Sequence, residues 1–190
     1  MQKKPIIIIL VLCVISLGLG YLSGLKEEDS LSNGDTETDS KKEPEFLKEG
    51  LVAYYPFNGN AKDESGNGND GEVKGATLAD DRHGKSNSAY AFDGVDDFVN
   101  VESSSSLKIT GDITLSVWVK FIEGGTGNPR IISHGWEKGW ELLTGKGAWS
   151  PVGFFHGGNK HRLVDATFKG DDSWFHILAL KKGTEFSLFV

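Results

Sequence analysis

Polar and apolar positions alternate along most of the chain from residue 47 to residue 190, in short apolar runs separated by clusters of Gly, Asn, Asp and Ser. A period of two is typical of strands, because successive side chains of a strand point to opposite faces. We expect strands that begin at Leu51, Glu72, Ser88, Phe98, Ile113, Arg130, Trp140, Val152, Arg162, Trp174 and Phe186. About ten short strands in one domain predict an all-β fold, a two-sheet antiparallel jelly-roll sandwich.

The run ITLSVWVKF shows the alternation most clearly. Its odd-numbered residues, from Ile113 to Phe121, are all apolar and are expected to face the core. The even-numbered residues share the opposite face, where Trp118 stands among Thr, Ser and Lys. An aromatic ring on a polar face has two interpretations: a platform on which a sugar stacks, or a ring covered by a loop. We name Trp118 as a candidate ligand-binding residue and keep both interpretations.

The first 25 residues differ from the rest of the chain. Lys3 and Lys4 precede an unbroken apolar run from residue 6 to residue 15, which is typical of export segments. Gly18 and Gly20 favour cleavage, although residues 6–25 also have the ~20-residue length that spans a bilayer. Residues 1–25 are therefore predicted to be a signal peptide or an N-terminal membrane anchor, and the protein is expected to be extracellular or on the cell surface. The only cysteine, Cys13, lies in this run, so we expect no disulfide in the folded part.

Residues 26–46 form a charged, mostly acidic stretch with too few apolar groups to offset the entropy cost of ordering. We expect a disordered acidic linker here and a folded domain over residues 47–190. The net charge of the chain is −7. A nucleic-acid partner is disfavoured, because phosphate binding needs clustered positive charge.

Two acidic loops are candidates for a cation site. The stretch DESGNGNDG, residues 63–71, contains no apolar side chain, and its first half resembles an EF-hand loop. Lys74 occupies the position where an EF-hand needs a bidentate Glu, and neither flank has a helical pattern, so an EF-hand is excluded. Two alternatives stay open: a Gly-rich loop whose oxygen atoms wrap a hard cation, and an ordinary turn.

The second acidic loop is DGVDD, residues 93–97, at the start of an alternating run. Adjacent carboxylates repel each other unless water or a cation screens them. The two loops together predict a shared cation site, and the family resemblance described below implies calcium as the ion. The predicted ligands are Asp63, Asn67, Asn69, Asp96 and Asp97.

Four blocks, in this order, carry a resemblance to a known family: GLVAYYPFNGNAKDESGNGNDG, YAFDGVDDFVNV, ITLSVWVKF and WFHILALKKGTEFSLFV. Residues 50–190 resemble the LamG-like, concanavalin A-like jelly-roll domain in its laminin-G type three form. The resemblance implies two curved antiparallel sheets and an accessory module that binds glycans or mediates adhesion, often with one bound calcium. It therefore implies a glycan or a cell-surface protein as partner.

The sequence departs from the pattern of that family at its C-terminal end. In members of that family a Trp and a His, matched here by Trp174 and His176, precede a hairpin and then further strands that close the sandwich. Here the chain stops at Val190, directly after the hairpin. We therefore expect that the domain over residues 47–190 is truncated at its C-terminus.

Aromatic residues supply the glycan hypothesis. In HGWEKGWELLTGKGAW, Trp136 lies among glycines and is a candidate for sugar stacking together with Trp118, whereas Trp140 begins an apolar run and is expected in the core. The scattered histidines have no zinc-ligand spacing. Glycoside hydrolases of this fold carry an E-x-D-x-x-E strand, which the sequence lacks.

We therefore expect an exported, non-catalytic carbohydrate-binding or adhesion module, stabilised by calcium. The alternatives are an accessory domain of a larger polysaccharide-degrading enzyme and a protein–protein adhesion domain.

Overall fold

The computed structural model describes residues 7–15, 50–121, 130–135, 139–144, 152–157, 161–165 and 172–190, and for 7–15 and 161–165 it describes the backbone. Within these ranges the chain forms strands and turns and no helix, so the all-β class is confirmed. No helix of the described ranges is long and apolar enough to span a membrane. Trp136 and the expected linker at 26–46 lie outside the described residues.

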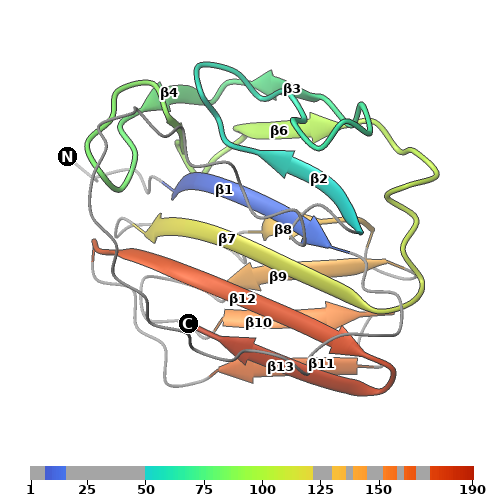
Figure 1. Ribbon diagram of the computed structural model, residues 1–190. Coiled ribbons are helices and arrows are strands. Elements are labelled where there is room, and N and C mark those ends of the chain that lie inside the picture. Colours follow the sequence, from blue (N-terminus) through green and yellow to red (C-terminus); the bar gives the residue numbers. More distant parts are fainter. Residues whose placement is uncertain are drawn as a thin grey trace, which may run out of the picture.

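The largest sheet has seven strands, and every pairing in it is antiparallel. Its order is β13 (Glu185–Phe189), β12 (Trp174–Lys182), β7 (Ile113–Phe121), β1 (Ile7–Ile15), β5 (Ala89–Phe92) and β4 (Thr77–Ala79), and β2 (Leu51–Tyr55) pairs with β1 beside this path. In Figure 1, β2, β1, β7 and β12 cross the molecule side by side. We call this layer the large sheet.

A four-stranded antiparallel sheet lies behind the large sheet in Figure 1. Its order is β11 (His161–Asp165), β10 (Val152–His156), β9 (Trp140–Thr144) and β8 (Arg130–Ser133). A separate antiparallel pair joins β3 (Gly71–Lys74) to β6 (Phe98–Val101). Strands were predicted at all of these places except residues 7–15. The all-β class is observed, whereas the more specific assignment to a jelly-roll sandwich stays a prediction.

The core lies between the layers. On β7, the odd-numbered residues from Ile113 to Phe121 are all buried, as predicted, and Leu115, Val117 and Val119 are fully inaccessible. They join one apolar cluster with Ile177 of β12 and with Leu142 and Phe154 of the four-stranded sheet. Because both layers contribute to one cluster, burying their apolar faces together is what holds them against each other.

The strand expected to begin at Glu72 was predicted as one run, EVKGATL, and this is wrong, because the run divides into β3 and β4 at Gly75. Gly75 has a φ of +76°, a left-handed conformation that glycine adopts without strain. The turn sends β3 to pair with β6 and β4 to pair with β5. A Cβ at Gly75 would lie 1.9 Å from Oδ1 of Asp97. Glycine is therefore required here both by the backbone angle and by the close approach of Asp97.

The predicted export segment contributes a strand. Residues 7–15 form β1, which lies in the interior of the large sheet between β7 on one side and β2 and β5 on the other. An apolar run of this length suits a strand in the middle of a sheet as well as a segment in a membrane, because both environments exclude water. The assignment of residues 1–25 as a signal peptide or anchor stays a prediction.

Candidate functional site

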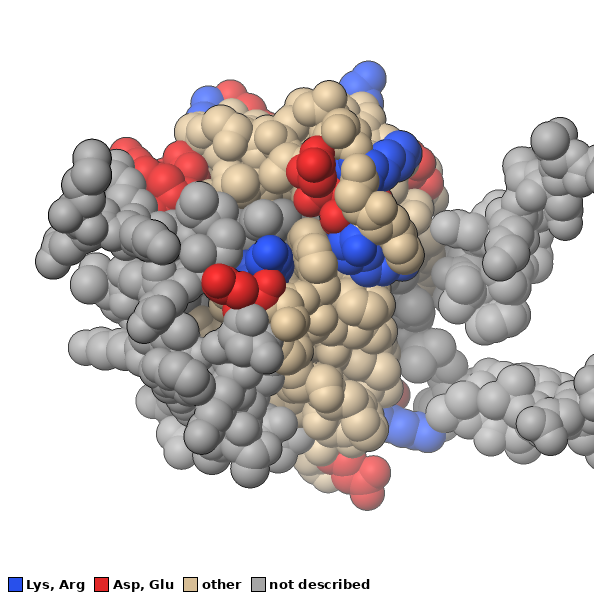
Figure 2. Space-filling model, turned by 90° about the vertical axis from the view of Figure 1, so that its left-hand side faces the viewer, with Lys and Arg blue, Asp and Glu red and all other residues tan. Residues whose placement is uncertain are grey.

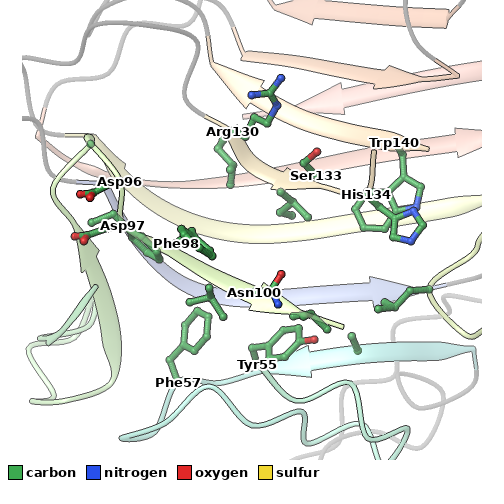
Figure 3. Close-up of a pocket in the computed structure, with 18 of the residues that line it drawn as sticks. Tyr55, Phe57, Asp96, Asp97, Phe98, Asn100, Arg130, Ser133, His134 and Trp140 are labelled. Carbon is green, nitrogen blue, oxygen red and sulfur yellow. The ribbon is translucent and has the colours of Figure 1, made fainter. Parts of the chain in front are cut away.

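A cavity of about 600 Å³ lies between β6 and β8, and we call it the β6–β8 cleft. All four residues of β6 and all four of β8 line it. Within the described ranges, β6 pairs only with β3 and β8 pairs only with β9, so neither strand continues the other's sheet. Figure 3 shows Tyr55 and Phe57 on one side of the cleft and Arg130 and Ser133 on the opposite side. The cleft therefore lies between the two-stranded sheet that contains β6 and the four-stranded sheet that contains β8.

Three carboxylates gather at one end of the cleft. Asp93, Asp96 and Asp97 each have an oxygen atom within 4.8 Å of the others. The turn that holds them is shaped by backbone donors: the amide of Asp93 donates to Oδ2 of Asp97 at 2.8 Å, and the amide of Val95 donates to Oδ1 of Asp93 at 2.9 Å. Asp96 is exposed. Several close carboxylate oxygens form the kind of donor set that a hard cation such as calcium uses.

The other end of the cleft is aromatic. His134 stacks on Trp140 with ring centroids 5.6 Å apart and an angle of 18° between the planes. Trp140 is 3% exposed, and its Nε1 has no hydrogen-bond partner among the described residues. Along the side of the cleft opposite Arg130 and Ser133, Tyr55 and Phe57 stack with ring centroids 6.1 Å apart, and the hydroxyl of Tyr55 donates to the carbonyl of Asn69. Burial, reinforced by the charges of Asp63 and Asp70, raises the pKa of Tyr55, so this hydroxyl stays protonated.

A buried carboxylate fixes the side of the cleft formed by β8. Glu141 of β9 is 2% exposed, and its Oε1 accepts hydrogen bonds from Nε of Arg130 at 3.1 Å and from Oγ of Ser133 at 2.6 Å. Its Oε2 has no partner in the described part of the chain. Because Arg130 and Ser133 both line the cleft, Glu141 positions two polar groups of the cleft from behind.

Hydrophobic side chains are exposed beside the acidic end. Val95 is 70% exposed and Phe98 is 51% exposed, and both line the cleft. Phe98 is the first residue of β6 and follows Asp97 directly in the sequence. The acidic end of the cleft therefore combines carboxylates with an accessible aromatic face.

Asp63 organises the other acidic loop by accepting four hydrogen bonds. Its Oδ1 accepts from the amides of Tyr54 and Ser65, and its Oδ2 accepts from Oγ of Ser65 and from the amide of Asn69, all at 2.8–2.9 Å. Partial burial of the carboxyl acts to raise its pKa, but these donors outweigh burial and lower it. Asp63 is therefore ionised at neutral pH and anchors the loop through protein donors.

Asn67 and Asn69 tie the same loop to β2. Nδ2 of Asn67 donates to the carbonyls of Leu51 and Val52, and Nδ2 of Asn69 also donates to the carbonyl of Val52. Asn69 is only 3% exposed, and its Oδ1 accepts from Oγ of Ser104 at 2.6 Å. Both amides therefore have structural partners.

Of the predicted calcium ligands, the structure brings Asp96 and Asp97 together. It groups them with Asp93, which the prediction left out, and Asp63 is not a member of this group. Asn67 and Asn69 lie with Asp63 in the other loop. The two acidic loops are therefore two separate arrangements, and calcium binding at either one stays a prediction.

Trp118 lies on the outer face of the large sheet, as its parity indicated, and it is partly buried. His176 of β12 stacks on it with centroids 4.9 Å apart, and Cζ of Arg82 lies 4.5 Å from the ring centroid. Nε2 of His176 makes a 2.8 Å hydrogen bond with Oγ of Ser116. Burial, together with the charge of Arg82, lowers the pKa of His176. The loop that joins β4 to β5 thus covers Trp118 through Arg82.

Charged groups of both signs are mixed on the surface. On the side of the molecule shown in Figure 2, Lys and Arg side chains of the described residues lie next to Asp and Glu and form no continuous basic surface. Phosphate backbones bind to continuous basic surfaces. This side of the molecule therefore gives no support to a nucleic-acid partner.

Comparison of the chain with protein-family models, with curated proteins and with solved structures gave no match.

Proposed function

We propose that this protein is an exported, non-catalytic binding module that takes up a glycan in the β6–β8 cleft. The observation that carries the proposal is the make-up of that cleft: a volume of about 600 Å³ lined by aromatic and polar side chains, with the ring of Phe98 exposed. Sugars present apolar C–H faces ringed by hydroxyl groups, so they need ring faces and hydrogen-bonding groups together. In the cleft, Phe98 offers an accessible ring, and Asn100, Arg130 and Ser133 offer polar atoms.

Calcium has a structural role in this proposal. Asp93, Asp96 and Asp97 would hold the ion at the acidic end of the cleft, where it would offset their mutual repulsion and fix the turn that leads into β6. Because β6 forms one side of the cleft, calcium would support glycan binding by ordering that side. Asp63, Asn67 and Asn69 stay predicted calcium ligands. They lie in the other acidic loop, and their side chains already make hydrogen bonds with the protein.

The absence of the E-x-D-x-x-E pattern supports a module without catalysis. A protein partner is the second candidate, and the exposure of Val95 and Phe98 favours it. Adjacent exposed apolar side chains on a soluble surface often mark contacts between proteins. The same surface therefore serves both candidates.

A glycan array probed with the full chain, in buffers with calcium and with chelator, tests the proposal. Phe98→Ala should weaken binding to any glycan the array identifies by about two- to twelvefold, since contact with one aromatic ring contributes about 0.5–1.5 kcal/mol. Phe189→Ala is the matched control, because Phe189 is 59% exposed and does not line the cleft. Equal losses in the two variants, or no bound glycan, would contradict glycan binding at this cleft.

Calcium is tested separately by thermal unfolding. Added calcium should raise the Tm of the full chain, and at a hundred times the dissociation constant the linkage contributes about 2.7 kcal/mol. Asp96→Asn should abolish this response, whereas Asp80→Asn, which changes an exposed carboxylate outside the cluster, should keep it. A calcium response that survives Asp96→Asn would place the ion elsewhere.

A further inference from the structure

The place of β1 in the large sheet points to an acceptor site for a strand. β1 pairs with β7 along its whole length, with β5 through Ile7, Ile8 and Ile9, and with β2 from Leu12 to Ile15. The far edge of β7 pairs with β12, and the far edge of β5 pairs with β4. In the described ranges, β1 is therefore the one link between the half of the sheet that contains β7 and the half that contains β2 and β5.

The same residues carry the features of an export segment. One backbone cannot sit in a membrane, or be cleaved off, and also pair within the sheet. When residues 7–15 leave, the inner edge of β7 and the edges of β2 and β5 lose their hydrogen-bond partners at once. These edges adjoin the fully buried residues Leu115, Val117 and Val119, so the vacated slot would expose unpaired backbone beside the core.

We propose that this slot, between β7 and the strands β2 and β5, is a strand-acceptor site. The chain's own Ile7–Ile15 fills it in cis, and after export an apolar strand of another protein fills it in trans. The occupant is defined by what the slot already holds: nine extended residues, apolar throughout and antiparallel to β7, β2 and β5. Ladder hydrogen bonds on both sides would supply the affinity, as in other cases of strand addition to a sheet.

The single natural cysteine allows a direct test in the full chain. Cys13 pairs with Ser116 of β7, and directly opposed residues of antiparallel strands lie about 4.5–5.5 Å apart at Cα, within the range that a disulfide spans. Ser116→Cys should therefore give an intramolecular disulfide with Cys13 under mild oxidation. Ser187→Cys on β13, which pairs with β12 and not with β1, is the matched control. Equal disulfide yields in the two variants would show that the slot does not hold residues 7–15.

Capture in trans is tested with a synthetic peptide of residues 3–15, in a chain that carries Cys13→Ser and Ser116→Cys. Adding Val11→Pro removes a ladder donor from the centre of β1 and should release the segment. The peptide should then form a mixed disulfide with residue 116 at least tenfold more than in the Lys3→Pro control, whose change lies outside β1. If Val11→Pro unfolds the chain, the peptide should restore native fluorescence. Failure of both the mixed disulfide and the restoration would overturn the proposal.

Discussion

Replacing Asp63 with alanine removes the acceptor that holds residues 63–70 against β2. Four donors lose their partner: the amides of Tyr54, Ser65 and Asn69, and the hydroxyl of Ser65. A hydrogen bond to a charged group contributes about 1.5–3 kcal/mol. The four bonds share one carboxylate that is partly exposed, and the loop can relax, so they do not add in full. We expect a loss of about 2–4 kcal/mol in the free energy of unfolding.

The assay is urea unfolding of the full chain, followed by tryptophan fluorescence, with calcium and with chelator. The structure predicts a loss in both buffers, because the four hydrogen bonds to Asp63 come from protein donors and do not depend on an ion. Asp80→Ala, which removes an exposed carboxylate for which the structure gives no hydrogen bond, should change stability by less than about 0.5 kcal/mol. A loss below about 1 kcal/mol for Asp63→Ala would refute the role of the carboxylate as loop organiser. A loss seen only with calcium would make Asp63 a ligand.

The pH dependence gives an independent check on the same residue. The pKa of Asp63 is lowered in the folded protein from the ordinary value of 3.8. Below that value the unfolded state binds more protons than the folded state, so stability falls as the pH drops through the folded pKa. The stabilising contribution is complete above about pH 5. Asp63→Asn should therefore flatten the acid limb of the stability curve.

Three further predictions follow from other contacts. Gly75→Ala should lower the free energy of unfolding by about 1–3 kcal/mol, because alanine is strained at a φ of +76° and its Cβ would meet Asp97. Urea unfolding measures this loss, and an unchanged midpoint would contradict the contact. Trp118→Ala should lower the free energy of unfolding by more than about 1 kcal/mol, since it removes both the stack on His176 and the cation–π contact with Arg82. A loss of glycan binding with an unchanged Tm would instead support a sugar platform at Trp118. The lowered pKa of His176 predicts that stability falls as the pH drops below about 6.5, and His176→Gln should remove that slope.

The strands could be predicted because their signal is local. In β7 the alternation of ITLSVWVKF fixes which residues are buried, and a slip of one residue would turn the whole apolar row to solvent. The division at Gly75 was missed because glycine inside an alternating run is compatible with a strand as well as a turn. The division is accompanied by a contact that the local pattern does not contain, the approach of Asp97 to Gly75.

The cleft could not be predicted in the same way. It depends on β6 and β8 not pairing with each other, a property of two segments that residues 102–129 separate in the sequence. Glu141 was also missed as a positioning group, since a Glu at an alternate position of a strand normally faces solvent. Its burial follows from the donors on β8, which the sequence does not reveal.

The contrast between the two acidic loops shows which is better prepared for a cation. Four neutral protein donors bind the carboxylate oxygen atoms of Asp63 and stabilise its negative charge, so a cation would have to compete with those hydrogen bonds. Asp96 accepts no hydrogen bond in the part of the chain that the structure describes, and it is exposed within 4.8 Å of two further carboxylates. Backbone amides donate to Asp93 and Asp97, and the repulsion that remains between the carboxylates can be relieved by water, protons or a cation. Calcium should therefore act first on the turn that leads into β6, and its effect on the cleft should be larger than its effect on the loop at residues 63–70.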